Sequence, residues 1–171
     1  MIQENTVSEL SHKKVLSAEQ GRVVLAEIRA GGGTSVFTNG CFDILHPGHI
    51  QYLEQAHKLG DILIVGLNSD DSVKRIKGLE RPISAQDARA YMLAALSCVD
   101  YVILFDEDTP TRLIEYLKPN ILVKGADWEG KQLPGSDAVD RVEFMPFLTG
   151  WSTTDIIGRI RAVLEIELSF S

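Results

Sequence analysis

The sequence predicts an α/β fold, a Rossmann-like, doubly wound and mostly parallel sheet of five strands with helices on both faces. Apolar runs of strand length alternate with helical stretches along most of the 171 residues, and this alternation is typical of parallel strands joined by crossover helices. The run DILIVGL at 61–67 is almost continuously apolar, as expected of a strand buried on both faces of such a sheet. An apolar content of 44% is sufficient for a single domain with its own core.

The chain begins with a segment that carries no structural signal. Residues 1–12 are polar and without periodicity, so we expect a mobile N-terminal arm followed by a single domain over 13–171. A first helix is expected over 17–29, because its apolar residues recur on one side: Leu16, Val23, Val24 and Ile28. The triple glycine at 31–33 ends this helix and precedes a strand, so it is interpreted as a linker and not as a phosphate-binding loop.

The five strands and the helices between them follow in strict alternation. Strands are expected over the apolar runs 35–38, 61–67, 101–105, 121–123 and 142–145. Helices are expected at about 48–59, 71–76, 84–97, 110–118 and 153–167. Ser84 with Asp87 three residues later approximates a capping box, Thr109 and Pro110 are interpreted as the N-cap and first residue of the next helix, and Ser152 is expected to cap the last helix.

In a doubly wound sheet, ligands bind beyond the carboxyl ends of the strands, where the strand order reverses. The loops at those ends are expected over 39–49, 68–70, 105–109, 124–135 and 146–152. These loops contain the histidine-rich segment and several of the charged side chains discussed below.

Composition excludes several classes of protein. No apolar run approaches the roughly 20 residues that span a membrane, and the first residues lack the apolar region of a secretion signal. Cys41 and Cys98 are the two cysteines of the chain, too few for a disulfide framework, so we expect reduced thiols in a cytoplasmic protein. A formal net charge of −7 disfavours nucleic acid as a partner, but it allows a small phosphate ligand in one basic cleft.

The segment TNGCFDILHPGH at 38–49 holds two of the four histidines of the chain. It follows the first strand of the alternation and begins the next helix, whose free N–H groups and partial positive charge attract phosphate. Gly40 would let the backbone approach an anion, and Gly48 would leave space between the imidazoles. His46 and His49, three positions apart, would point into the same mouth, where they can stabilise negative charge that develops on a phosphorus centre.

Other interpretations of this segment have weaker support. One or both histidines could instead cap the helix or lie in the core. A zinc site is disfavoured, because no third histidine or cysteine has ligand spacing. The sequence has no G-x-x-x-x-G-K-[ST] phosphate loop and no G-x-S-x-G nucleophile motif. Cys41 is either a reactive thiol or a small apolar residue in a tight turn.

Four segments in order, TNGCFDILHPGH, KGLERPI, LVKGADW and GWSTTDII, resemble the motifs of the HxGH nucleotidyltransferase superfamily. The resemblance covers about residues 14–162 and is strongest to the heptose 1-phosphate adenylyltransferases of bacterial lipopolysaccharide-core synthesis, which also share EDTPTRLI and LPGSDAV. It implies the nucleotidylyl transferase fold. Glycerol-3-phosphate cytidylyltransferases are also similar, but they have Arg-Thr-Glu-Gly where this chain has Phe-Leu-Thr-Gly at 147–150. Trp128 departs from the heptose group, which often has Tyr there, and the absence of a sugar-kinase segment would make this the free-standing form.

The resemblance implies transfer of AMP from ATP to D-glycero-D-manno-heptose 1-phosphate, with release of pyrophosphate. It also implies that Mg²⁺ accompanies the ATP. His46, His49 and Lys124 would be catalytic. The resemblance assigns these residues to nucleotide binding: Cys41, Phe42, Gly48, Lys124, Gly125, Asp127, Ser152, Thr153 and Thr154. Mg²⁺ would be held mainly by phosphate oxygens and water, with no dedicated protein ligand.

A second set of residues is assigned to the acceptor by the same resemblance. These are Lys14, Thr38, Asn39, Gly40, Asp43, Asp70, Lys77 and Arg81. For Asp43 and Asp70 the alternative is a helix cap, and for Lys77 and Arg81 it is a solvated charge run in place of a lid. Trp128 is either a wall of the pocket or a core residue, and a cap at Ser152 accounts for one of the three hydroxyls at 152–154.

The adenylyltransferase is the preferred function, and CTP:glycerol-3-phosphate cytidylyltransferase is the alternative. A regulatory nucleotide-binding module is disfavoured, because a pure binder has no need of both histidines, and nothing particular supports an interaction protein. We expect small-molecule partners, no nucleic acid or membrane, and a homodimer. The helix expected over 84–97 is either the dimer interface or part of the core.

Overall fold

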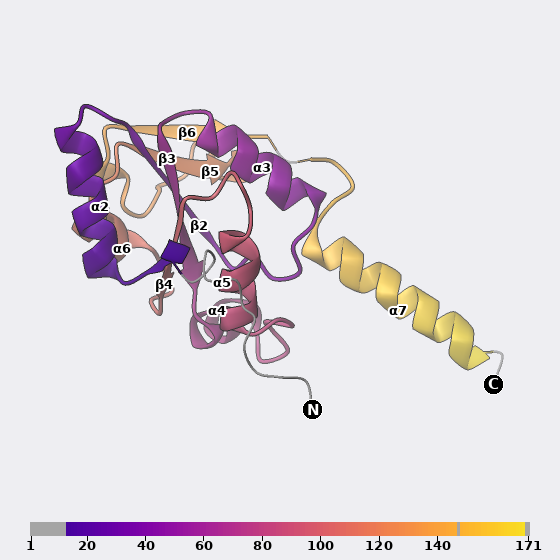
Figure 1. Ribbon diagram of the computed structural model, residues 1–171. Coiled ribbons are helices and arrows are strands. Elements are labelled where there is room, and N and C mark those ends of the chain that lie inside the picture. Colours follow the sequence, from indigo (N-terminus) through magenta and orange to yellow (C-terminus); the bar gives the residue numbers. More distant parts are fainter. Residues whose placement is uncertain (1–12, 147, 170–171) are drawn as a thin grey trace.

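The computed structural model describes residues 13–146 and 148–169, which form a sheet covered by helices on both faces (Figure 1). The expected arm at 1–12 lies outside the described residues. The sheet has six parallel strands in the order β1-β4-β3-β2-β5-β6. The strands are β1 (Val15–Leu16), β2 (Ser35–Gly40), β3 (Ile62–Asn68), β4 (Tyr101–Phe105), β5 (Ile121–Gly125) and β6 (Arg141–Met145).

Helices connect the strands of this sheet, as the alternation predicts. They are α2 (Ala18–Ala30), α3 (Pro47–His57), α4 (Asp70–Lys77), α5 (Gln86–Ala94), α6 (Thr111–Leu117) and α7 (Thr153–Ser169), with 3-10 turns η1 (Ala126–Trp128) and η2 (Ser136–Ala138). No helix in the described part of the chain has the length and apolarity needed to cross a membrane.

The strand order reverses at β2. The chain passes from β2 to β3 and β4 on one side, and returns to β5 and β6 on the other side of β2. The carboxyl ends of β2 and β5 therefore meet at the switch point, where open parallel sheets bind their ligands. The α/β fold is confirmed, and the site lies at the edge of the sheet that the sequence indicates.

The core is divided by the sheet into two apolar layers. In β2, Val36 belongs to the layer covered by α3 and α5, whereas its neighbour Phe37 belongs to the layer covered by α2 and α6. This alternation follows from the two-residue period of a strand. Gly66 of β3 is paired with Asn39, and a Cβ on Gly66 would approach the Phe37 ring to 2.6 Å. The glycine in DILIVGL therefore leaves room for a large aromatic side chain.

Three expectations about the elements were wrong in detail. A sixth strand, β1, pairs with β4 through Val15 and Leu16, but two residues are too few to show a period. The expected capping box at Ser84 is not formed: α5 begins after Ala85 without a side-chain cap. Pro110, and not Thr109, is the N-cap of α6.

Candidate active site

Two adjoining cavities open at the carboxyl ends of β2 and β5, with volumes of about 350 and 410 Å³. The first cavity extends towards η1 and the start of α7, and the second extends towards the end of α4 and the segment after β4. Both are lined by the same central residues: Asn39, Gly40, Cys41, Phe42, His49, Lys124, Trp128 and Thr153. Two ligands, one in each cavity, would therefore meet at these shared residues.

His46 and His49 stand at the start of α3. His46 is the N-cap, and its Nδ1 accepts a hydrogen bond from the His49 N–H at 3.3 Å. Because Nδ1 is the acceptor, the proton of a neutral His46 ring lies on Nε2, which is free to donate. His46 therefore caps the helix, as one of the two interpretations expects, and it also lines the first cavity.

The two imidazole rings stack, with their centroids 3.7 Å apart and their planes at 18°. Burial lowers the pKa of His46. Burial, with a smaller contribution from His46, lowers the pKa of His49 from 6.5 to about 4. Both rings are therefore neutral near pH 7 and act as hydrogen-bond donors instead of cations. The Nδ1 atom of His49 is buried and has no hydrogen-bond partner among the described residues.

Two glycines leave room for side chains that line the first cavity. A Cβ on Gly48 would lie 3.1 Å from the His46 ring and 3.4 Å from the Cβ of Trp151. A Cβ on Gly40 would lie 3.1 Å from the ring of Phe42. Side chains at these positions would therefore displace the groups that line the first cavity.

Lys124 and Asn39 lie at the ends of the neighbouring strands β5 and β2. The Lys124 Nζ donates to Asn39 Oδ1 at 2.5 Å and lies 5.4 Å from the centre of the Trp128 ring. Burial lowers the pKa of this ammonium from 10.5 to about 8, although Asp127 opposes the shift. Trp128 is a wall of both cavities and also packs against the core, so both of its interpretations hold.

The three consecutive hydroxyls at the start of α7 have different environments. Ser152 is the cap, since its Oγ accepts from the Asp155 N–H at 3.0 Å. Thr153 Oγ1 donates to the main-chain oxygen of Asp43 at 2.9 Å. Thr154 lines the second cavity. All three line one or both cavities, and Thr153 also fixes the helix to the loop that follows β2.

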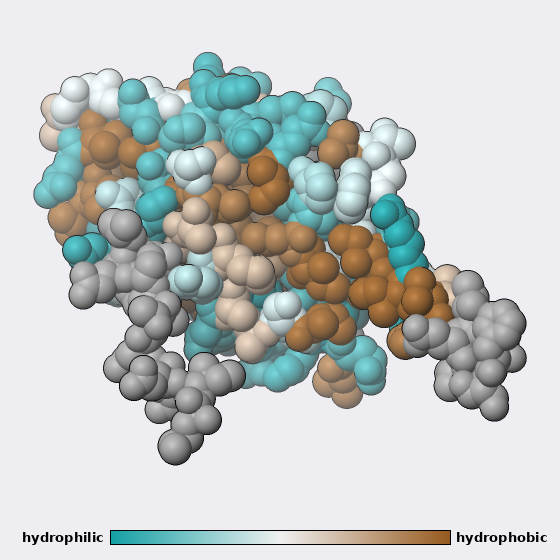
Figure 2. Space-filling view, turned by 45° about the vertical axis from the view of Figure 1, so that its right-hand side comes forward, coloured by the Kyte–Doolittle hydropathy of each residue, from teal (hydrophilic) through white to brown (hydrophobic). Residues whose placement is uncertain are grey.

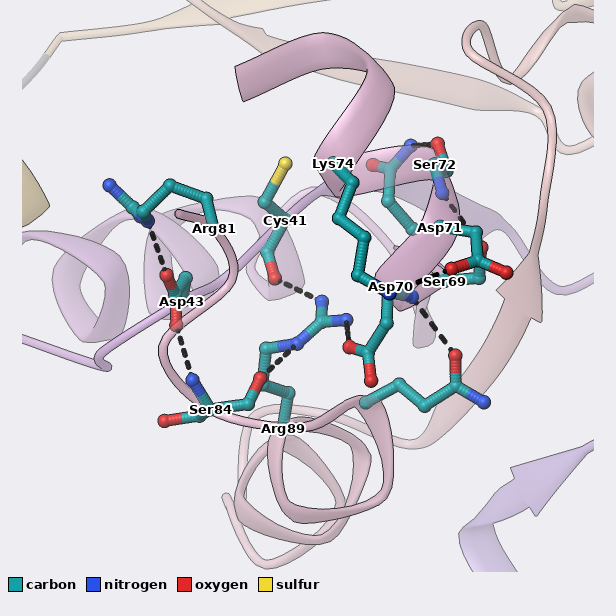
Figure 3. Close-up of polar contacts among 12 residues, drawn as sticks. Cys41, Asp43, Ser69, Asp70, Asp71, Ser72, Lys74, Arg81, Ser84 and Arg89 are labelled. Carbon is teal, nitrogen blue, oxygen red and sulfur yellow. Dashed lines mark hydrogen bonds and ion pairs between the residues drawn. The ribbon is translucent and has the colours of Figure 1, made fainter. Parts of the chain in front are cut away.

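The side chain of Asp43 holds the loop between α4 and α5 in place (Figure 3). It accepts from the Ile83 and Ser84 N–H groups, each at 2.9 Å, and from Arg81 Nε at 2.7 Å. Burial raises the pKa of Asp43, but these donors more than offset burial, so the pKa falls below its usual value. Asp43 is therefore not a helix cap, and Arg81 reaches the second cavity while paired to it.

Arg89 of α5 holds the same loop from the other side (Figure 3). Its side chain is completely buried. It donates to the Ser84 oxygen at 2.9 Å, to the Cys41 oxygen at 2.6 Å and to Asp70 Oδ1 at 2.8 Å. We call the contacts of Asp43 and Arg89 the loop clamp. The clamp constrains the backbone around Phe42. The φ of this residue is +46°, which is unfavourable for any residue other than glycine.

Three residues expected at the acceptor have other positions. Lys14 donates to the carbonyl oxygens of Leu96 and Val99, at the amino ends of the strands and thus at the opposite edge of the sheet. Thr38 is buried, and its hydroxyl pairs with the Tyr52 hydroxyl at 2.7 Å. Asp70 belongs to the loop clamp and is not a helix cap either, because Ser69 caps α4.

Of the remaining acceptor candidates, Lys77, Arg81 and Asp43 line the second cavity. Arg89 and Tyr52 could not be predicted from the sequence, because a single arginine or tyrosine in a helix carries no pattern that indicates burial. Trp151, a wall of the first cavity, was also not predicted. Burial raises the pKa of the Cys41 thiol, which favours the interpretation as a small residue in a turn over that of a reactive thiolate.

The cavities contain few carboxylates. Asp127 is the one carboxylate that lines the first cavity, and Asp43 and Asp108 line the second. Within the described residues, no group of three or more His, Cys, Asp or Glu side chains is placed to hold a metal ion.

The fold and the cavities define an α/β protein whose candidate site lies where its first long strand meets a helix. The sequence matches the family described as cytidylyltransferase-like over residues 37–159, and the chain belongs to this family. The matched range runs from β2 into α7 and contains every residue shared by the two cavities.

Relatives and solved structures agree with this assignment. The chain is 56% identical over 149 residues to the bifunctional protein HldE of Campylobacter fetus subsp. fetus, covering 87% of this chain and 32% of that protein. The bifunctional protein HldE of Helicobacter pylori is 54% identical over 151 residues, covering 88% of this chain and 32% of that protein. The chain thus spans about a third of the length of the curated relatives it matches.

A crystal structure of the lipopolysaccharide core biosynthesis protein from Thermoplasma volcanium is similar, with a TM-score of 0.57 and 31% identity over 68% of this chain and 98% of that one. The pantoate-beta-alanine ligase of Francisella tularensis has a TM-score of 0.54 at 14% identity, over 83% of this chain and 74% of that one. The second similarity concerns the fold alone.

Proposed function

We propose that this protein transfers AMP from ATP to D-glycero-D-manno-heptose 1-phosphate, forming ADP-heptose and pyrophosphate for lipopolysaccharide core synthesis. The observation that carries the proposal is the stacked, neutral histidine pair beside the junction of two cavities. The similarity to HldE proteins and to a lipopolysaccharide core biosynthesis protein supports the choice of acceptor.

In this proposal the nucleotide occupies the first cavity and the sugar phosphate the second. Cys41, Phe42, Gly48, Gly125 and Asp127 line the first cavity, and Asp127 would reach the ribose. Asn39 and Gly40 line both cavities, and the cationic Lys77 and Arg81 line the second. The start of α7 at Ser152, Thr153 and Thr154 would hold the β- and γ-phosphates.

The reaction is a direct displacement. An oxygen of the sugar 1-phosphate forms a bond to the α-phosphorus of ATP, the bond from that phosphorus to the oxygen bridging the β-phosphorus breaks, and pyrophosphate leaves with the electron pair. His46 Nε2 and the His49 ring would donate to the α-phosphoryl oxygens as charge grows on them. Lys124 would place its positive charge beside the same phosphoryl group.

Mg²⁺ bound to the triphosphate would neutralise the negative charge that develops on the leaving pyrophosphate. The protein residues would position the two substrates and stabilise the transition state. Removal of one donor of this kind typically costs on the order of 10²-fold in rate.

We also propose a cytoplasmic location. The use of ATP as a substrate and the two free cysteines support it.

The proposal is tested by pyrophosphate release over a grid of substrates. ATP, CTP and GTP are each combined with heptose 1-phosphate, glycerol 3-phosphate and phosphoethanolamine. We expect turnover with ATP and heptose 1-phosphate. Turnover only with CTP and glycerol 3-phosphate would establish the alternative, a glycerol-3-phosphate cytidylyltransferase. This alternative is compatible with the family description, which is cytidylyltransferase-like.

A further inference from the structure

The helix α7 (Thr153–Ser169) is attached to the body of the protein only near its beginning, and the rest projects away from it (Figure 1). Thr153 is bonded to the oxygen of Asp43. Arg159 donates to the Gly150 oxygen at 2.7 Å and lies over the ring of Trp151, 5.1 Å from its centre. Beyond Arg159, no side-chain hydrogen bond joins α7 to another element in the described part of the chain.

The projecting part of α7 has an exposed apolar face. Ile160, Val163 and Leu164 are 51, 57 and 52% exposed, and their spacing of three and four residues places them on one side of the helix. Ile156 and Ile157 continue this face towards the body, where they are half-buried. Figure 2 shows the apolar surface along α7 and its continuation onto the body. A single helix of this length is only marginally stable without packing.

An apolar groove lies beside the root of α7. Its volume is about 590 Å³, and its apolar lining comes from Leu45, Pro47, Ile50 and Leu148. The polar side chains of His46, Gln51 and Glu54 complete the lining. The groove and the helix face together form one surface, which we call the α7 surface. Contiguous exposed apolar surfaces of this kind mark sites of protein association.

We propose that the α7 surface pairs two copies of this chain, with their α7 helices antiparallel about a two-fold axis at Val163. The charges of α7 are self-complementary in this register. In an antiparallel pair, a residue that precedes Val163 lies opposite the residue that follows Val163 by the same number of positions in the second copy. Arg161 therefore lies opposite Glu165 of the second copy. This contact occurs twice by symmetry.

In this register Ile157 of one copy is level with Ser169 of the other, so the exposed apolar residues of the two helices face each other. A membrane surface is the less favoured occupant. The helix carries Asp155, Glu165 and Glu167 against two arginines, and the chain has a net charge of −7, whereas membrane-surface helices are rich in basic residues. The pairing does not depend on the proposed adenylyl transfer.

The register is tested by cross-linking. Val163→Cys places a thiol at the two-fold axis, and Ala162→Cys places one on the other side of the same helix. Under mild oxidation we expect a disulfide-linked dimer of the full chain with Val163→Cys and not with Ala162→Cys. The unaltered chain is the control for Cys41 and Cys98. Equal cross-linking of both variants, or none of the Val163→Cys variant, would overturn the register.

The surface is tested by the molar mass in solution, measured by light scattering and sedimentation. We expect the unaltered chain to be a dimer, Val163→Glu to be a monomer with an unchanged circular dichroism spectrum, and Val23→Glu to remain a dimer. Val23 is the matched control, because it is 58% exposed on α2. An unaltered chain that is monomeric, or a Val163→Glu variant that stays dimeric, would overturn the proposal.

The charge pairing is tested by reversal. Arg161→Glu alone should weaken the dimer by about tenfold in Kd, because it sets like charges opposite each other. The double variant with Glu165→Arg should restore the affinity, because the pairs form again with opposite sign. Failure of the double variant to restore the affinity would overturn the antiparallel register.

Discussion

The guanidinium group of Arg89 donates a hydrogen bond to the main-chain oxygen of Cys41 at 2.6 Å, from a side chain that is completely buried. This bond joins α5 to the loop that lies between β2 and the histidine pair. The same side chain binds Asp70 and the oxygen of Ser84. Arg89 therefore positions the loop of the active site without lining either cavity.

We expect Arg89→Lys to destabilise the protein by about 2–3 kcal/mol, because an ammonium cannot make three bonds in the plane of the guanidinium and leaves buried acceptors without donors. Chemical denaturation measures this change. Arg75→Lys is the control, since Arg75 forms exposed ion pairs with Asp106 and Asp108, and its replacement should change stability much less. Equal stability of the two variants would show that the buried bonds are dispensable.

Two variants separate the capping role of His46 from its chemistry. His46→Ala should lose the cap, at a cost of about 1 kcal/mol, whereas His46→Asn keeps a capping acceptor. Both should lose about 10²-fold or more in kcat, because both lack the Nε2 donor. Steady-state kinetics and thermal unfolding measure the two effects. A near-normal kcat for His46→Asn would remove His46 from the chemistry.

The buried His49 makes stability depend on pH. Its pKa is about 4 in the folded chain and 6.5 as the ordinary value, so the unfolded chain takes up this proton first as the pH falls. The stabilising contribution of the neutral ring is complete above pH 6.5 and is lost as the pH approaches 4. The free energy of unfolding of the wild type should therefore fall more steeply over this range than that of His49→Gln. Parallel curves would contradict the lowered pKa.

Lys124 should produce an alkaline limb in the rate profile. Because its pKa is about 8, the ammonium loses its proton just above neutral pH, and with it the charge that is proposed to act on the phosphoryl group. We expect kcat to decline around pH 8, and Lys124→Arg to move this decline to higher pH, because a guanidinium stays protonated. A decline at the same pH in both enzymes would assign it to another group.

Two glycine-to-alanine substitutions should affect different properties, one the rate and the other the stability. Gly48→Ala should reduce kcat by about tenfold or more, because its Cβ would lie 3.1 Å from the His46 ring and shift a catalytic donor. Gly158→Ala in α7 meets no atom within 4 Å and should stabilise the helix by up to about 1 kcal/mol. Kinetics and thermal unfolding measure the pair. A loss of activity in Gly158→Ala would show that the effect is not local to His46.

The sequence predicts the alternation of strands and helices, the edge of the sheet at which the cavities open, and the place of His46, His49, Gly48 and Lys124 at that edge. These features are local, because a strand, a helix start or a close approach at a glycine follows from residues near one another in the chain. A parallel sheet then brings the strand ends together without further information.

Tertiary structure alone decided the roles of Lys14, Thr38, Asp43, Asp70 and Arg89. A charged or hydroxyl side chain has the same sequence signature whether it faces a ligand or a neighbouring element. Its partner is chosen by contacts between segments far apart in the chain, such as Arg89 with Cys41 and Lys14 with Val99. The short edge strand β1 and the exposed face of α7 are of the same kind, because pairing and burial depend on what the folded chain places beside them.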